Sequence, residues 1–168
     1  FITNNAMGYS YSSSMDDIKV AGIPADVTGN YPCCRQNCSE EAYHKKFLSL
    51  VDFEIALIRG YDYYLNNKED VIKRLVEYSA QPKDYVEAAM YGTDSYRNVM
   101  DLSPDPHTKE VVEYYKAMMS IGEIEQSDYD MADYAVPFVY KKALDTLLER
   151  EPDNATYKKL AEDYPKYN

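Results

Sequence analysis

The chain has no tryptophan, six glycines and three cysteines among its 168 residues. Six scattered glycines are too few for a loop that cradles phosphate, and neither G-x-G-x-x-G nor a Walker pattern occurs. The cysteines, Cys33, Cys34 and Cys38, form an odd and closely spaced set, which does not build a disulfide framework. The sequence therefore excludes nucleotide-cradling loops and disulfide-rich scaffolds.

Positive charge is also scarce. The chain has 18 Lys and Arg against 29 Asp and Glu, which gives a net charge of −11. Nucleic acid and anionic membranes both need a cationic protein surface, so we exclude them as partners. The sequence contains no run of 18 apolar residues, so it predicts no transmembrane helix. Apolar residues make up 45% and charged residues 28%, which is typical of a soluble globular protein.

Patterns for catalysis are missing as well. His44 and His107 are the two histidines, and neither stands beside a serine or cysteine in a nucleophile motif. The run Ser12-Ser13-Ser14 is not G-x-S-x-G, and Asp128-Tyr129-Asp130 lacks the spacing of an EF-hand. We predict that the chain is not an enzyme and has no cofactor or metal.

Strand-like segments are confined to the first forty residues. Residues 1–3 are β-prone, residues 18–23 are rich in β-branched side chains, and residues 31–36 indicate a further short strand with Pro32 at its edge. Residues 7–14 fit a loop or a short helix. Two or three short strands do not make a self-sufficient sheet, so the sequence is typical of the second half of an α/β protein.

From Ser39 onward the pattern is helical. Ser39 is a good N-cap, and the apolar spacing predicts one long helix from about residue 40 to residue 65, which Asn66-Asn67 ends. Further helices are predicted over 68–78, from Pro82 to Gly92, over 107–121, over 135–150, and from Asn154 to about 163.

The order of several motifs supports a family resemblance. Phe1-Ile2-Thr3-Asn4-Asn5 is followed by Tyr-Pro-Cys-Cys-Arg-Gln at residues 31–36, which leads straight into the long helix. Asn-Asn-Lys-Glu-Asp at 66–70 and Tyr-Ala-Val-Pro at 134–137 come later. This series resembles the C-terminal half of the solute-binding proteins of ABC importers, in the SsuA-like group for nitrate, sulfonates, taurine and thiamine precursors.

The resemblance implies a bilobed α/β fold of the type II periplasmic-binding class. Residues 1–30 would end the second lobe, residues 31–38 would form a strand that crosses the hinge, and residues 39–168 would supply helices on the first lobe. It also implies a small-molecule ligand, an ABC permease as partner, and a missing N-terminal half or a partner chain. The location would be periplasmic or extracellular, as a lipoprotein whose leader is removed or lies outside this sequence.

The expected ligand-binding residues lie at the ends and turns of the predicted strands. They are Asn4, Asn5, Tyr9, Tyr31, Cys33, Cys34 and Arg35. Arg35 can hold an anion through its guanidinium, or it can pair with one of the many acids. The two asparagines fit either a ligand site at a strand end or ordinary turn chemistry.

Other interpretations stay open at this point. The cysteines fit small buried side chains, a Cys34–Cys38 disulfide, or a metal site that His44 would join. An enzyme of the thiamine-pyrimidine synthesis type would use the same fold, and His44 is its one histidine near the strands. A helical protein-interaction module is the remaining alternative to the solute-binding function.

Overall fold

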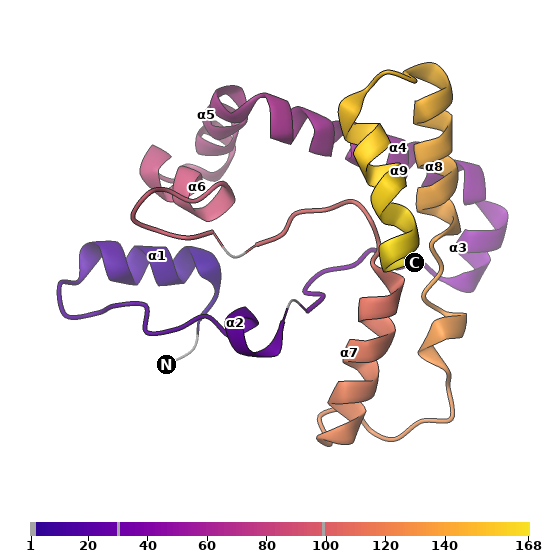
Figure 1. Cartoon of the computed structure of the whole chain (residues 1–168), viewed down its shortest axis with the longest axis horizontal. Coiled ribbons are helices and arrows are strands. Elements are labelled where there is room, and N and C mark those ends of the chain that lie inside the picture. Colours follow the sequence, from indigo (N-terminus) through magenta and orange to yellow (C-terminus); the bar gives the residue numbers. More distant parts are fainter. Residues whose placement is uncertain (1–2, 30, 99) are drawn as a thin grey trace. The chain divides into compact units, whose positions relative to one another are not determined.

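The structure is a computed structural model that describes residues 3–29, 31–98 and 100–168 (Figure 1). Over these residues the chain forms helices joined by loops. In chain order the helices are α1 (Asn5–Ser14), α2 (Ala25–Thr28), α3 (Glu40–Lys45), α4 (Phe47–Asn66), α5 (Lys68–Ser79), α6 (Lys83–Met90), α7 (Thr108–Ser120), the 3₁₀ helix η1 (Met131–Asp133), α8 (Phe138–Arg150) and α9 (Ala155–Tyr167).

The predicted α/β fold is therefore wrong. The described residues contain no β-strand, and their one β-type pairing is an isolated bridge between Thr93 and Tyr96. The segments 18–23 and 31–36, both predicted as strands, are irregular, and residues 1–2 of the predicted first strand lie outside the described part. A β-branched run becomes a strand only when a partner pairs with its backbone, and the described chain supplies none.

Most helix predictions are confirmed. Helices α5, α6, α7 and α8 lie where the apolar periodicity places them, and residues 7–14 belong to a helix. The long helix is interrupted at Lys46, so α3 and α4 are separate. The last helix runs four residues beyond the predicted end, to Tyr167, and includes Pro165 in its final turn. Three predicted polar positions cap helices: Asn4 for α1, Ser39 for α3 and Asn154 for α9.

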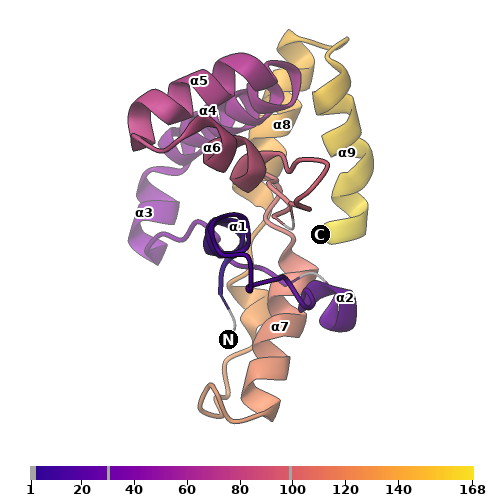
Figure 2. The same ribbon diagram turned by 90° about the vertical axis from the view of Figure 1, so that its left-hand side faces the viewer.

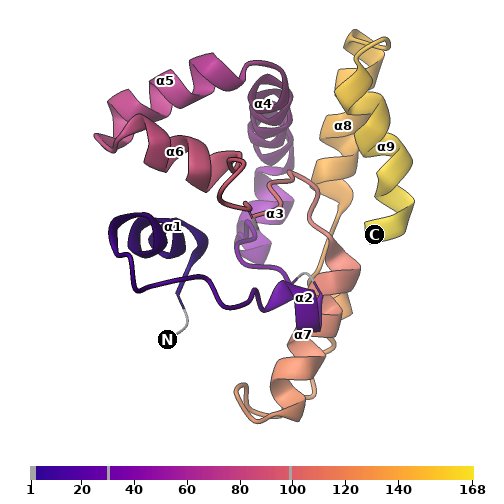
Figure 3. The same cartoon turned by 60° about the vertical axis from the view of Figure 1, so that its left-hand side comes forward.

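The chain divides into two compact units. The first contains residues up to 30 together with 63–102, and the second contains 31–62 together with 103–168. In the first unit α6 contacts both α1 and α5, as Figure 3 shows. Its buried side chains are Ile72, Val86, Ala88 and Ala89. A Cβ on Gly8 would stand 2.7 Å from the Tyr96 hydroxyl, so a larger residue there would force that hydroxyl to shift.

The second unit has the larger core. Helices α8 and α9 run side by side in Figures 1 and 2, and both contribute to the same apolar cluster as α4. The cluster consists of Val51, Ile55, Ile58, Tyr140, Ala143, Leu144, Leu147, Tyr157 and Leu160. Helix α7 packs on α9 and on η1, yet neither α7 nor η1 has a buried side chain.

Candidate functional site

Four of the seven predicted ligand-binding residues lie in one exposed loop, residues 31–38, which we call the 31–38 loop. Arg35 holds this loop within the second unit. Its Nε donates a hydrogen bond to the carbonyl oxygen of Pro106 at 2.8 Å, and its Nη1 donates to that of Cys34 at 2.7 Å. Arg35 therefore anchors the loop through backbone carbonyls rather than through an acidic side chain.

An aromatic pair flanks the loop. The ring of Tyr31 stacks on that of Tyr114 in α7, with centroids 5.8 Å apart and planes 19° from parallel. Tyr31 is 51% exposed and Tyr114 is 38% exposed, so the pair keeps an open aromatic face. Such a face accepts an apolar or cationic group of a ligand.

The three cysteines are free and exposed, so their interpretation as small buried side chains is wrong. The Sγ atoms of Cys33 and Cys34 lie 3.5 Å apart. The hydrogen bond between these thiols is the main cause that raises the pKa of Cys33, and the charge of Arg35 opposes it. Within the described residues, no group of three or more His, Cys, Asp and Glu side chains could hold a metal ion.

The other three predicted site residues belong to the first unit and make structural contacts there. The Asn4 side chain accepts from the Met7 backbone N–H and so caps α1. Asn5 Nδ2 donates to the Ala89 carbonyl oxygen at 3.1 Å, and the Tyr9 hydroxyl donates to Asp84 Oδ2 at 3.1 Å. These bonds tie α1 to α6. Turn and capping chemistry explains Asn4 without a ligand.

A buried polar group that the sequence prediction missed lies in the second unit. Glu54, Asp105 and Tyr140 are each at least 93% buried, since their exposed fractions are 7%, 3% and 3%. Glu54 Oε1, Asp105 Oδ2 and the Tyr140 hydroxyl have no hydrogen-bond partner. Burial, and after it the charge of Asp105, raises the pKa of Glu54 to about 7. The signal was present in the sequence, because Glu54 falls on the apolar face of the long helix.

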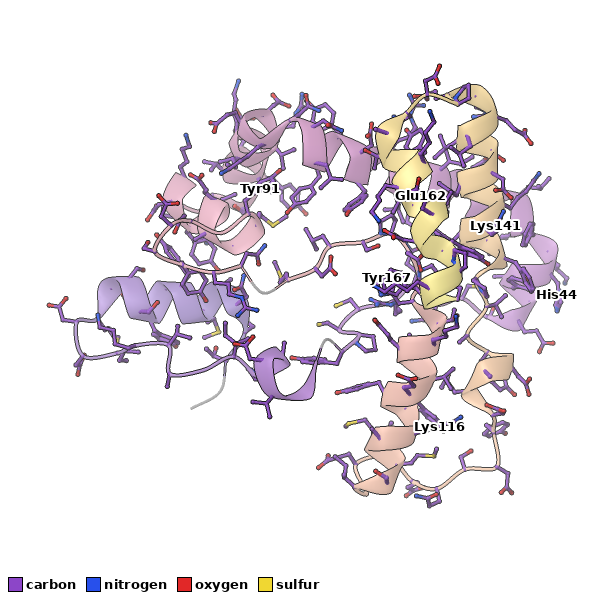
Figure 4. All side chains as sticks on the ribbon, viewed as in Figure 1. His44, Tyr91, Lys116, Lys141, Glu162 and Tyr167 are labelled. Carbon is purple, nitrogen blue, oxygen red and sulfur yellow. The ribbon has the colours of Figure 1, made fainter. Side chains whose placement is uncertain are left out.

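The remaining oxygen of Asp105 organises the turn before α7. Asp105 Oδ1 accepts from the His107 backbone N–H and from Asn168 Nδ2, both at 2.8 Å. His107 adopts a left-handed backbone (φ 49°), and its ring stacks on that of Tyr167 with centroids 3.8 Å apart. Tyr167 is labelled in Figure 4. This histidine therefore has a structural role at the end of α9.

Two further features are His44, in the second unit, and an open hollow in the first unit. His44 is exposed on α3, with its Nε2 3.7 Å from Glu40 Oε1 (Figure 4). The hollow measures about 610 Å³ and includes Lys68, Tyr91 and Arg97 in its lining. Lys68 pairs with Glu87 at 2.7 Å, and Arg97 pairs with Asp26 at 2.9 Å. Since both cations are already paired, the hollow is a weaker candidate than the 31–38 loop.

Comparisons of the chain with protein-family models, with curated proteins and with solved structures gave no match. None of the helices in the described residues has the length and apolar character needed to cross a bilayer.

Proposed function

We propose that the chain is the solute-binding component of an ABC importer, which captures a small molecule and delivers it to a permease. Two lines support the proposal: the order of motifs along the chain, and the 31–38 loop. The 31–38 loop is the observation that carries the proposal, because it presents an anchored guanidinium and two thiols to solvent and its Tyr31 stacks on Tyr114 of α7. A periplasmic or extracellular location belongs to the same proposal.

The loop favours a small organic anion. The described bonds of Arg35 use Nε and one Nη atom, so the second Nη atom can donate to a carboxylate or sulfonate. The Tyr31–Tyr114 pair would cover the apolar part of the same molecule. Capture of this kind requires no reacting group.

Titration calorimetry with taurine, benzoate and benzenesulfonate tests the proposal, because each of them is a small organic molecule with a carboxylate or a sulfonate. We expect saturable binding of at least one of them, and a loss of about tenfold in affinity for Arg35→Gln, because a charge-assisted hydrogen bond disappears. Arg150→Gln is the matched control, since Arg150 is exposed in the last turn of α8. Absence of binding by all three, or an equal loss in both variants, would contradict the proposal.

A second candidate function is a helical protein-interaction module. One observation favours it: α7 has apolar side chains along one face, yet none of its residues is buried. The enzyme alternative has no such support, since His44 is exposed and the charged partner described for it is Glu40, at 3.7 Å.

A further inference from the structure

The segment that follows α7 is poorly covered by the rest of its unit. We call residues 121–138 the acidic aromatic segment. It contains η1, which packs on α7, and neither of these helices has a buried side chain. A helix of 13 residues is marginal in water unless one of its faces is packed. The pair therefore has apolar surface that further packing would stabilise.

Large side chains stand in solvent along this segment. Tyr129 is 70% exposed, Tyr134 is 63% exposed and Phe138 is 62% exposed. The rings of Tyr129 and Tyr134 meet edge to face, with centroids 5.9 Å apart. Aromatic side chains are enriched at the centres of protein interfaces, whereas scattered exposed apolar residues are ordinary. The gathering of aromatics in one segment therefore indicates a contact surface.

All charged side chains of the same segment are acidic. Five acids and no Lys or Arg occur between residues 121 and 138. The acids are exposed, and none of them takes part in an ion pair that the structure describes; they are Glu123, Glu125, Asp128, Asp130 and Asp133. Asp145 and Asp163 differ from them, because each has a lysine partner at 2.6 Å.

Charge decides which partner fits. A second copy of this chain would bring another net charge of −11, and nucleic acid or an anionic membrane would also be repelled. Arginine suits both parts of the surface, because a guanidinium pairs with carboxylates and stacks on aromatic rings. We propose that the acidic aromatic segment docks an arginine-rich segment of a partner protein. The proposal goes beyond solute binding and does not depend on it.

The test uses the full chain and two labelled probe peptides, nona-arginine and nona-lysine, followed by fluorescence anisotropy. We expect nona-arginine to bind about tenfold more tightly, because lysine stacks less well on rings. In the triple variant Tyr129→Ser/Tyr134→Ser/Phe138→Ser, the affinity for nona-arginine should fall to about the affinity for nona-lysine, although the net charge of the chain is unchanged. Equal binding of both peptides by the unmodified chain would overturn the proposal.

A charge-matched pair of variants separates docking from general attraction to an acidic protein. Asp128→Asn/Asp130→Asn removes two charges inside the segment, and Asp16→Asn/Asp17→Asn removes two exposed charges in the first unit. We expect the first pair to weaken nona-arginine binding by about tenfold and the second to change it less than twofold. Equal losses would overturn the proposal. So would self-association of the chain that the triple variant abolishes, because the occupant would then be a second copy.

Discussion

Glu54 gives the sharpest prediction at the scale of single residues. Its raised pKa means that the folded chain holds a proton more tightly than the unfolded chain does. Lowering the pH from about 8 to about 5 should therefore stabilise the second unit, by up to about 3 kcal/mol for a shift from 4.5 to about 7. Glu54→Gln should remove this pH dependence and stabilise the unit at high pH. Urea unfolding followed by circular dichroism measures both effects.

The control for this prediction is Glu113→Gln, which neutralises an exposed glutamate on α7. It should leave the pH dependence as it is. A pH dependence that persists unchanged in Glu54→Gln would contradict the assignment of the proton to Glu54.

Single residues also mark how far sequence reasoning reaches. Helix caps depend on a few neighbouring atoms, and Ser39 and Asn154 do cap the helices that the sequence predicts. Burial depends on segments far apart in the chain. The exposure of Cys33 and the missing partner of Tyr140 follow from tertiary packing, so local patterns do not determine them. The sequence motif identifies the 31–38 loop. It does not predict the hydrogen bond from Arg35 to the Pro106 carbonyl oxygen, because 71 residues separate the two positions.

At the scale of elements, helices and strands differ in what local sequence can determine. A helix makes its hydrogen bonds within one segment, so the apolar period of 3.6 predicts α5 to α8 correctly. A strand makes its backbone hydrogen bonds with another strand, so β-branched content indicates only that a segment can pair. Residues 18–23 have that content and remain irregular. The predicted fold class was therefore wrong because β-branched content describes one segment alone and not the second strand with which it must pair.

The substitution of glycine by alanine should have opposite effects on stability at Gly60 and at Gly122. Gly60 lies exposed within α4, and Gly122 follows α7 with φ +79°; a Cβ at either position would meet nothing within 4 Å. Gly60→Ala should stabilise the chain by about 0.5–1 kcal/mol, because alanine favours a helix interior. Gly122→Ala should destabilise it by about 1–2 kcal/mol, because the left-handed backbone disfavours a Cβ. Thermal unfolding of the two variants measures the signs, and equal signs would contradict this account.

At the scale of the whole molecule, α4 belongs to both units. Residues 47–62 pack in the second unit, and the last turn from residue 63 packs in the first, where the Tyr64 hydroxyl donates to the Met90 carbonyl oxygen at 2.6 Å. The sequence pattern predicts this helix but not the change of partners along it. Its apolar residues recur in the same way on both sides of the boundary, because helical periodicity does not specify which neighbour covers a face.

The large net negative charge should make the thermal stability of the chain depend on salt. With a charge of −11 the compact chain repels itself more than the unfolded chain does, and screening should relieve that repulsion. Raising NaCl from about 10 mM to about 150 mM shortens the screening length from about 30 Å to about 8 Å, so we expect the melting temperature at pH 7 to rise by a few degrees. The exposed i,i+4 ion pairs, such as Lys45–Glu41, oppose this, but each contributes little. Near the isoelectric point of about 4.6 the repulsion is absent. An equal rise at both pH values would mean that salt acts through something other than net charge.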